Sequence, residues 1–260
     1  MKARHFFNAE AQRKRESHAE ESQIFLCETL IHPLRLSVKK WDSATHTEPM
    51  RAFIRIVASL LILARIATAG PITDEGEKLV RFLDSMHVEE HWIAGAIVEW
   101  RTGEPTGKPI KDDGRHTHCS QFAAAACDRL GIYLLRPPEH GSVLLANAQA
   151  DWLPSEKGKA KGWSPVKDGI AAQDIANRGS LVVAVYKNHD PKKSGHIAII
   201  RPSIKSEAEI KDEGPQVTQA GGTNRNSAPL KAGFGNHPKA FEKNEIAYYS
   251  HAIAFPAAVK

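Results

Sequence analysis

Two residues whose chemistry suits covalent catalysis each begin an apolar segment of the chain, Cys119 and His196. The stretch from Thr117 to Gly131 predicts one helix, because four consecutive alanines fill its middle and Gly131 supplies a favourable stop. A cysteine in the first turn of a helix lies beside free N–H groups and the positive end of the helix dipole, which lower the pKa of a thiol. His196 could take the thiol proton, so the pair predicts a nucleophile and its base.

The composition is that of a soluble globular protein and favours an anionic environment. Of the 260 residues, 42% are hydrophobic and 25% are charged. The net charge of +5 and the pI near 9.0 would suit a negatively charged partner such as cell-wall polymer. No arginine-rich run is interleaved with aromatic residues, so we expect no nucleic-acid partner.

Residues 50–69 have the three parts of a secretory signal peptide. Arg51 and Arg55 form a basic region, an apolar run follows at 56–64, and residues 67–69 fit the small-residue pattern of a cleavage site. The apolar run is shorter than the roughly 20 residues that a membrane span needs. We therefore expect cleavage near Ala69, export to the periplasm or the medium, and no stable membrane span in the mature form.

This hypothesis divides the chain into a tail, a signal peptide and one domain. Residues 1–49 are polar, and we expect them to be disordered or not translated, with the true start at Met50. Residues 70–260 would form the single catalytic domain. The alternative for residues 50–69 is a buried amphipathic helix in a cytosolic protein.

The cysteines support a reactive thiol in an exported protein. Signal cleavage would remove Cys27 and leave Cys119 and Cys127. Eight residues apart on one helix, their Cα atoms would be about 12 Å apart, beyond the roughly 7 Å limit for a disulfide. We expect Cys127 to be an inert core residue, and the alternative for Cys119 is the same buried role.

The order of predicted elements indicates the α+β class, with helices first and an antiparallel sheet after them. Thr73 caps a first helix, and Ser164 followed by Pro165 has the pattern of a helix start. The predicted helices span residues 74–87, 117–131, 143–153 and 166–177, and the predicted strands span residues 181–186, 196–200, 217–220 and 245–254.

Two short motifs follow the cysteine helix, Gly179-Ser-Leu-Val-Val183 and Gly195-His-Ile-Ala-Ile199. In this order, roughly residues 110–255 resemble the papain-like cell-wall cysteine hydrolases, namely the NlpC-type peptidases and the CHAP amidases. Ser180 stands where that family usually has Asp. The resemblance implies a papain-like fold, in which the nucleophile helix packs on a small antiparallel sheet. It also implies a peptidoglycan or peptide substrate, and we expect a monomer that needs no cofactor or metal.

The resemblance also implies roles for individual residues. Cys119 would be the nucleophile and His196 the base. The family places His, Asn or Gln on the strand after the histidine, where Gln219 fits, with Asn224 as the alternative. The oxyanion would be met by the Cys119 N–H and by a second donor from His118 or Gln121.

Two other groups of side chains allow other functions. Trp163, in an insert at residues 137–178, could line a peptide or sugar cleft or simply pack in the core. His116 and His118, together with His196, could hold zinc, although no His-Glu-x-x-His spacing is present.

The sequence thus predicts an exported cysteine hydrolase. It would cleave an amide bond in cell-wall peptide, as a peptidoglycan endopeptidase or amidase, through a Cys-His-Gln triad and a thioester. The alternatives are a zinc-dependent hydrolase that uses the His116–His118 pair, or a non-catalytic wall-binding module on the same fold.

Overall fold

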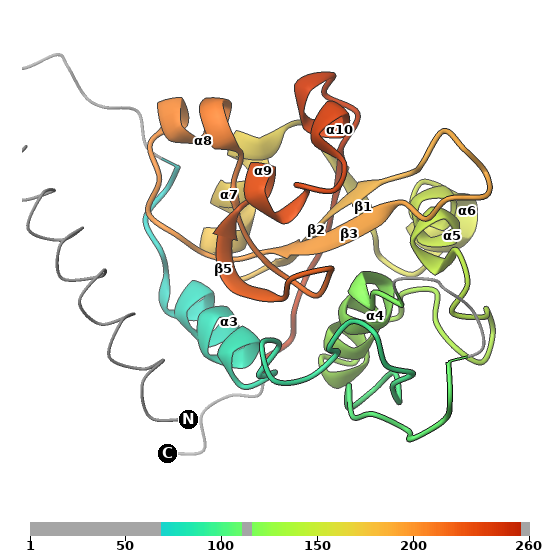
Figure 1. Ribbon diagram of the computed structural model, residues 1–260. Helices are drawn as coiled ribbons and strands as arrows, with labels where there is room; N and C mark the ends of the chain where they lie inside the picture. Colours follow the sequence, from blue (N-terminus) through green and yellow to red (C-terminus); the bar gives the residue numbers. More distant parts are fainter. Residues whose placement is uncertain (1–68, 111–115, 256–260) are drawn as a thin grey trace, which may run out of the picture. The chain divides into compact units, whose positions relative to one another are not determined.

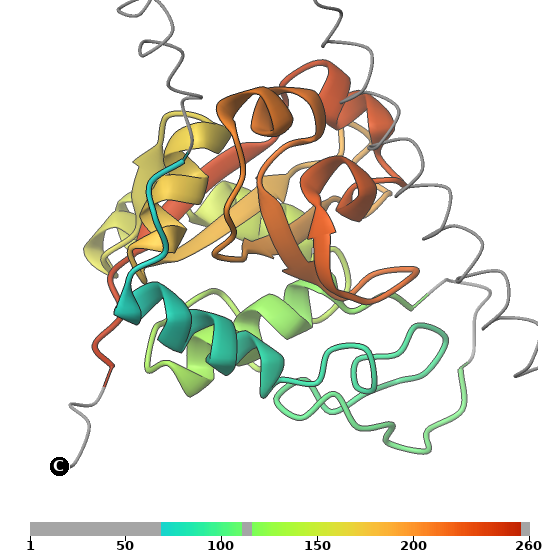
Figure 2. The same ribbon diagram turned by 90° about the vertical axis from the view of Figure 1, so that its left-hand side faces the viewer.

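The computed structural model describes residues 69–110 and 116–255 (Figure 1). The predicted tail at 1–49 and all of the predicted signal peptide except Ala69 lie outside the described residues. In the described part, one antiparallel sheet is covered by helices on both faces (Figures 1 and 2). The α+β class is confirmed. Within the same ranges, no helix is both long enough and apolar enough to cross a membrane.

Six strands form the sheet within the described residues, in the order β1-β6-β2-β3-β4-β5, and every neighbouring pair is antiparallel. The strands are β1 (Ser164–Val166), β2 (Leu181–Tyr186), β3 (His196–Ile200), β4 (Gln216–Gln219), β5 (Arg225–Pro229) and β6 (Ala247–His251). Both predicted central strands, β2 and β3, have the predicted bounds. They are continuous apolar runs rather than alternating ones because both of their faces are buried.

The helices lie before the first strand and between later strands. They are α3 (Asp74–Asp84), α4 (Cys119–Arg129), α5 (Leu145–Trp152), α6 (Glu156–Ala160), α7 (Gly169–Asn177), α8 (Glu207–Glu213), α9 (Leu230–Gly233) and α10 (Pro238–Glu242). Thr73 caps α3 as predicted, since its side chain accepts a hydrogen bond from the Gly76 N–H.

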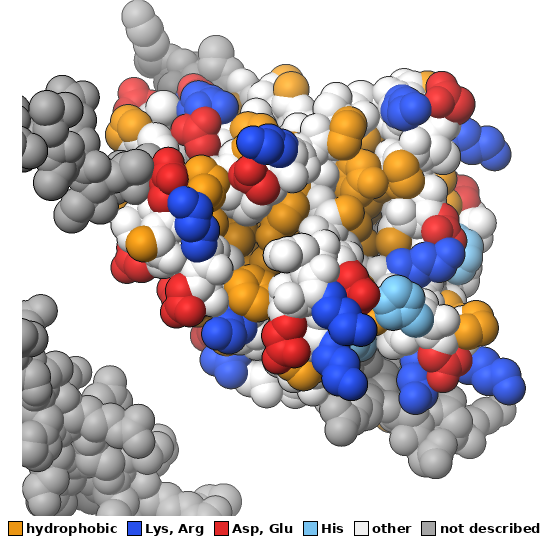
Figure 3. All heavy atoms as spheres, turned by 90° about the horizontal axis from the view of Figure 1, so that it is seen from above, with side chains coloured by type: hydrophobic (Ala, Val, Ile, Leu, Met, Phe, Trp, Pro, Cys, Tyr) orange, Lys and Arg blue, Asp and Glu red, His pale blue; other side chains and the backbone are white. Residues whose placement is uncertain are grey.

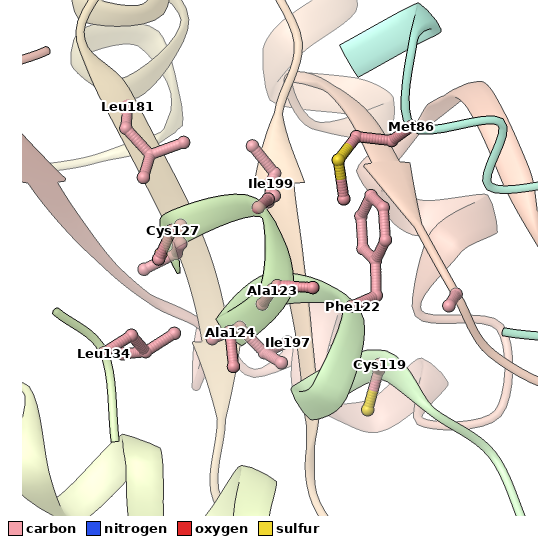
Figure 4. Close-up of a cluster of buried hydrophobic side chains, with 14 of the residues drawn as sticks. Met86, Cys119, Phe122, Ala123, Ala124, Cys127, Leu134, Leu181, Ile197 and Ile199 are labelled. Atoms are coloured by element: carbon pink, nitrogen blue, oxygen red, sulfur yellow. The ribbon is translucent and has the colours of Figure 1, made fainter. Parts of the chain in front are cut away.

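The core has two parts, one on each face of the sheet. On one face, Ile197 and Ile199 pack with Phe122 and the alanines of α4, as Figure 4 shows. On the other face, Ala198 and Ile200 pack with α7 and α9. Because successive residues of β3 alternate between these faces, a shift of one residue would exchange the two cores.

The cysteine helix α4 has the glycine stop that the sequence predicts, and it begins at Cys119, two residues later than predicted. Gly131 has a φ of 71°, a left-handed conformation that favours glycine. The Ile132 N–H donates to the Cys127 carbonyl at 2.8 Å and the Gly131 N–H donates to the Asp128 carbonyl at 3.1 Å. These two bonds form a Schellman motif. The four alanines are fully buried and allow α4 to approach β3 closely.

The helix predicted at 166–177 begins later than expected, and this prediction is wrong at its start. Residues Ser164–Val166 form the edge strand β1, in which Pro165 pairs with Tyr249 of β6. An edge strand tolerates proline because one side of the strand needs no N–H donor. The helix α7 starts at Gly169, and Asp168 caps it by accepting from the Ala171 N–H at 2.9 Å.

Candidate active site

The start of α4 reaches the sheet at the point where β3 and β4 separate. The ladder between these strands covers only Ile199 with Thr218 and Ile200 with Val217. Beyond it, the backbone N–H of Ile197 interacts with the Cys119 thiol and lowers its pKa. The thiol therefore lies against the backbone of the residue that directly follows His196.

The Cys119 thiol is buried, and this reverses the expected effect of the helix start. The residue is 3% exposed, and burial raises the pKa of the thiol. The N–H groups of Ile197, Ser120 and Cys119 itself lower the pKa but do not outweigh burial. Figure 4 shows the Cys119 sulfur at the first turn of α4, pointing away from Phe122 and Met86. Cys127 is fully buried in the core, as predicted, and burial raises its pKa as well.

His196 is held as a neutral imidazole. Its ring packs edge-on against Phe234, with 4.6 Å between the ring centroids. Burial, together with the neighbouring His237, lowers the pKa of His196 to about 3, and the interaction with Gln219 opposes this shift. A neutral imidazole is the form that can accept a proton. Within the described chain, however, no hydrogen bond joins this ring to the Cys119 thiol.

Gln219 lies beside His196 and has one unsatisfied atom. Its Nε2 donates to the Thr223 carbonyl at 2.8 Å. Its Oε1 and the Nε2 of His196 are both buried, and neither has a partner of normal hydrogen-bond geometry in the described structure. Because Gln219 nevertheless raises the pKa of His196, its amide interacts with the imidazole. A small approach of the two atoms would satisfy both.

A cavity of about 570 Å³ lies over these residues. Four of its described lining residues are aliphatic, the others are polar, basic or glycine, and none of them is Asp or Glu. The lining consists of Ile97, Val98, His116, Thr117, His118, Gln121, Ser142, Val143, Leu144, Lys192, Ser194, Gly195, His196, Gln219, Gly221, Gly233, Asn236 and His237. Cys119 is buried beneath this surface, between lining residues that precede and follow it in the chain.

His118 and Gln121 both line the cavity, but their side chains are engaged with protein groups. The ring nitrogens of His118 contact Gln121 Oε1 at 2.7 Å and the Ala96 carbonyl at 2.9 Å. The Gln121 amide also donates to the Ser142 hydroxyl at 3.1 Å. These contacts fix the segment that leads into Cys119. An oxyanion would therefore have to compete with these protein groups for a hydrogen bond from either side chain. The Ser142 hydroxyl accepts from Gln121 and still has its own proton to donate into the cavity.

The structure does not bring Trp163 and Asn224 to the cavity. Trp163 is 2% exposed and its indole N–H donates to the Tyr133 carbonyl. The Asn224 amide donates to the carbonyls of Val88 and His91 at 2.7 and 2.8 Å, and its oxygen accepts from the Gly221 N–H. Both side chains thus join distant backbone segments and have no free group for a substrate.

The zinc alternative finds no support in the described residues. Within them, no three His, Cys, Asp or Glu side chains come together as a metal-binding group. His118 has both ring nitrogens engaged, although it and His116 line the same cavity as His196.

Asn147 and His237 contribute to the site although no local pattern in the sequence singles them out. Asn147, buried on α5, accepts from the N–H groups of Asn188 and Gly195 at 3.0 and 2.8 Å and donates to the Lys193 carbonyl at 2.9 Å. It therefore clamps the turn between β2 and β3 directly before His196. The His237 ring lies 6.1 Å from the His196 ring, at the far side of the cavity floor.

A second hollow, of about 400 Å³, lies among α7, α8 and α10. Figure 3, which looks down on α8 and α10, shows apolar side chains gathered inside a rim of charged ones. None of its described lining residues is Cys, His or Ser. Of these two hollows, only the first has histidine or serine among its described lining residues.

Comparison with known protein families and with curated proteins gives no match to this chain. The function must therefore be argued from the site itself and from the resemblance in its short motifs.

Proposed function

We propose that this protein is a cysteine hydrolase that cleaves an amide bond, with Cys119 as nucleophile, His196 as base and Gln219 as the group that orients the base. The observation that carries the proposal is the interaction of the Cys119 thiol with the backbone N–H of Ile197, which lowers the pKa of that thiol. It joins the start of α4 to the first residues of β3, directly beside a neutral imidazole at the floor of a cavity.

The reaction would proceed from a neutral pair of side chains. Since burial raises the pKa of the thiol and lowers that of His196, the two groups do not exist as an ion pair at rest. His196 would take the thiol proton as the sulfur attacks the carbonyl carbon, and would return it to the leaving amine. Water would then hydrolyse the thioester, with His196 as the base once more.

Gln219 would act through the imidazole. If its Oε1 accepts from the Nε2–H of His196, the second ring nitrogen, Nδ1, is left unprotonated and can accept the thiol proton. The developing oxyanion would be met by the Cys119 N–H at the start of α4, and the Ser142 hydroxyl offers a second donor at the cavity wall.

We propose that the substrate is cell-wall peptide and that the protein is exported. The support is the resemblance in the two Gly-containing motifs, the signal-like pattern of residues 50–69 and the net charge of +5. Cleavage near Ala69 would leave Gly70 first in the mature chain. Gly70 is held by its carbonyl, which accepts from the Asn177 amide at 2.6 Å.

The test is a digest of purified peptidoglycan by the full chain, with products identified by mass spectrometry. We expect new muropeptide fragments from the wild type and none from Cys119→Ala, because the thioester cannot form. Cys127→Ala is the matched control, since it removes the other buried thiol of the same helix and should leave the products unchanged. Fragments from Cys119→Ala, or their absence from a folded wild type, would contradict the proposal.

A non-catalytic wall-binding module is the second candidate. It is favoured by the raised pKa of Cys119 and by the lack of a hydrogen bond between that thiol and His196 in the described structure. Retention of the wild-type protein on peptidoglycan without any fragment release would support this function. The same result would contradict the proposal that the protein is a cysteine hydrolase.

A further inference from the structure

We infer that the cavity binds a carboxylate of the substrate, next to the amide to be cleaved, and that the Lys192 ammonium is the group that binds it. This inference rests on the proposed function, because it assigns a substrate class to the same site.

The charges around the cavity favour an anion. The described lining contains one lysine and four histidines, His116, His118, His196 and His237, and no carboxylate. A substrate group with a negative charge would therefore meet no like charge on the described walls. A substrate amine would meet no counter-ion there and would lie near the Lys192 ammonium.

Lys192 is the lysine of its turn that has no acidic partner. Lys187 pairs with Asp151 at 2.7 Å and Lys193 pairs with Asp190 at 3.6 Å, whereas the described structure gives the Lys192 ammonium no ion pair. Its backbone N–H donates to Asp190, so that carboxylate is present in the turn but is shared with Lys193. The free ammonium is the one at the cavity.

The turn that carries Lys192 is held in place on several sides. Asn147 clamps the backbone of Asn188, Lys193 and Gly195, and the Asn188 amide also donates to the Ser194 carbonyl at 3.1 Å. Gly195 admits this clamp because a Cβ there would lie 2.6 Å from the Asn147 oxygen. The base of the lysine is thereby fixed relative to His196, which follows Gly195 directly.

Part of the cavity lining is apolar. It includes Ile97, Val98, Val143 and Leu144, and Val143 is 81% exposed. An apolar part of the substrate would lie against these residues, and its carboxylate against the Lys192 ammonium.

The test compares two synthetic stem peptides that differ only in a carboxylate or a carboxamide beside the scissile amide. We expect wild-type kcat/KM to favour the carboxylate by about fivefold, the upper range for an exposed ion pair. Lys192→Ala should lose this preference, and Lys192→Arg should keep it. Lys193→Ala is the matched control in the same turn and should behave as wild type.

Calorimetric binding of both peptides to Cys119→Ala separates this inference from the proposed function. A binding preference for the carboxylate that Lys192→Ala removes would sustain the carboxylate site even if neither peptide is cleaved. Cleavage with equal kcat/KM for both peptides, or a preference that survives Lys192→Ala, would overturn the site and leave the hydrolase. If the peptides were neither bound nor cleaved, both the carboxylate site and the proposed hydrolase would be overturned.

Discussion

Burial controls the charge of both reactive side chains at this site. The thiol of Cys119 is disfavoured as a thiolate and the ring of His196 is disfavoured as an imidazolium, each because the charged form would lose its hydration. A neutral pair avoids a buried charge in the resting protein. It also means that reactivity depends on proton transfer within the site rather than on a thiolate that is already present.

The lowered pKa of His196 makes stability fall in acid. The native ring binds a proton only near pH 3, whereas the unfolded ring binds one near pH 6.5. Below pH 6.5 the unfolded state therefore binds more protons, and this stabilises it relative to the native state. We expect the free energy of unfolding to drop by up to about 1.4 kcal/mol per pH unit between pH 6.5 and 4 from this residue alone. Urea unfolding at several pH values measures this slope.

His196→Gln should flatten that slope, although His118 and His237, whose pKa values burial also lowers, keep part of it. The control is His87→Gln, which removes an exposed histidine after α3 and should leave the slope unchanged. An equal slope in wild type and His196→Gln would show that the ring is solvated in the native protein.

Gln219 provides the residue-scale test of the triad. Gln219→Ala leaves the imidazole free to turn, and a misplaced base should lower kcat by roughly a hundredfold with little change in KM. Gln219→Glu keeps an acceptor oxygen and adds a negative charge beside the ring. It should therefore restore part of the rate and raise the acidic pKa of the pH–rate profile. Wild-type kcat in a folded Gln219→Ala would contradict the orienting role.

At the scale of elements, the position of His196 depends on the turn between β2 and β3. Asn147→Ala would leave the N–H groups of Asn188 and Gly195 without their buried acceptor, which should cost about 1–3 kcal/mol of stability. We also expect a loss of kcat, because β3 begins at His196. Thermal or urea unfolding and steady-state kinetics measure the two effects.

The matched control for this clamp is Asp151→Ala on the same helix α5. It breaks an exposed ion pair with Lys187 at the outer end of the turn and should change stability by less than about 1 kcal/mol. If Asn147→Ala were as mild as Asp151→Ala, the turn would be held by its own hydrogen bonds and not by α5.

The elements that could be predicted from the sequence are those whose causes are local. β2 is an apolar run, as is β3 after His196, and α4 carries its helix formers and its glycine stop within a few residues. β1 and β5 could not be predicted, because a short edge strand such as Ser164–Val166 exists only through pairing with β6, about eighty residues later. The local pattern of Ser164 and Pro165 therefore gave the wrong element.

The site follows the same division. Cys119 and His196 could be found because their chemistry and their place at the start of an element are visible in sequence. The roles of Trp163 and Asn224 could not be judged, since their polar atoms are satisfied by carbonyls distant in the chain. Asn147 acts only through a turn that lies about forty residues away, and nothing in its own segment indicates that contact.

At the scale of the whole domain, the two cores share one sheet, so a large opening of either face requires the strands to separate. Both thiols belong to the same core cluster, but Cys127 is fully buried near the end of α4, whereas Cys119 is the first residue of that helix and is flanked by residues that line the cavity. The two thiols of one helix therefore report different motions, namely opening of the entire domain and opening of the site.

Thiol labelling in a Cys27→Ser background separates these motions. We expect Cys127 to react with a rate whose denaturant dependence equals the full m-value of unfolding, and Cys119 to react faster with a small dependence. Mass spectrometry of peptides after timed labelling with iodoacetamide gives both rates. If Cys119 showed the full m-value as well, a substrate could not reach its sulfur without unfolding the domain, and the hydrolase would have to be abandoned for the binding module.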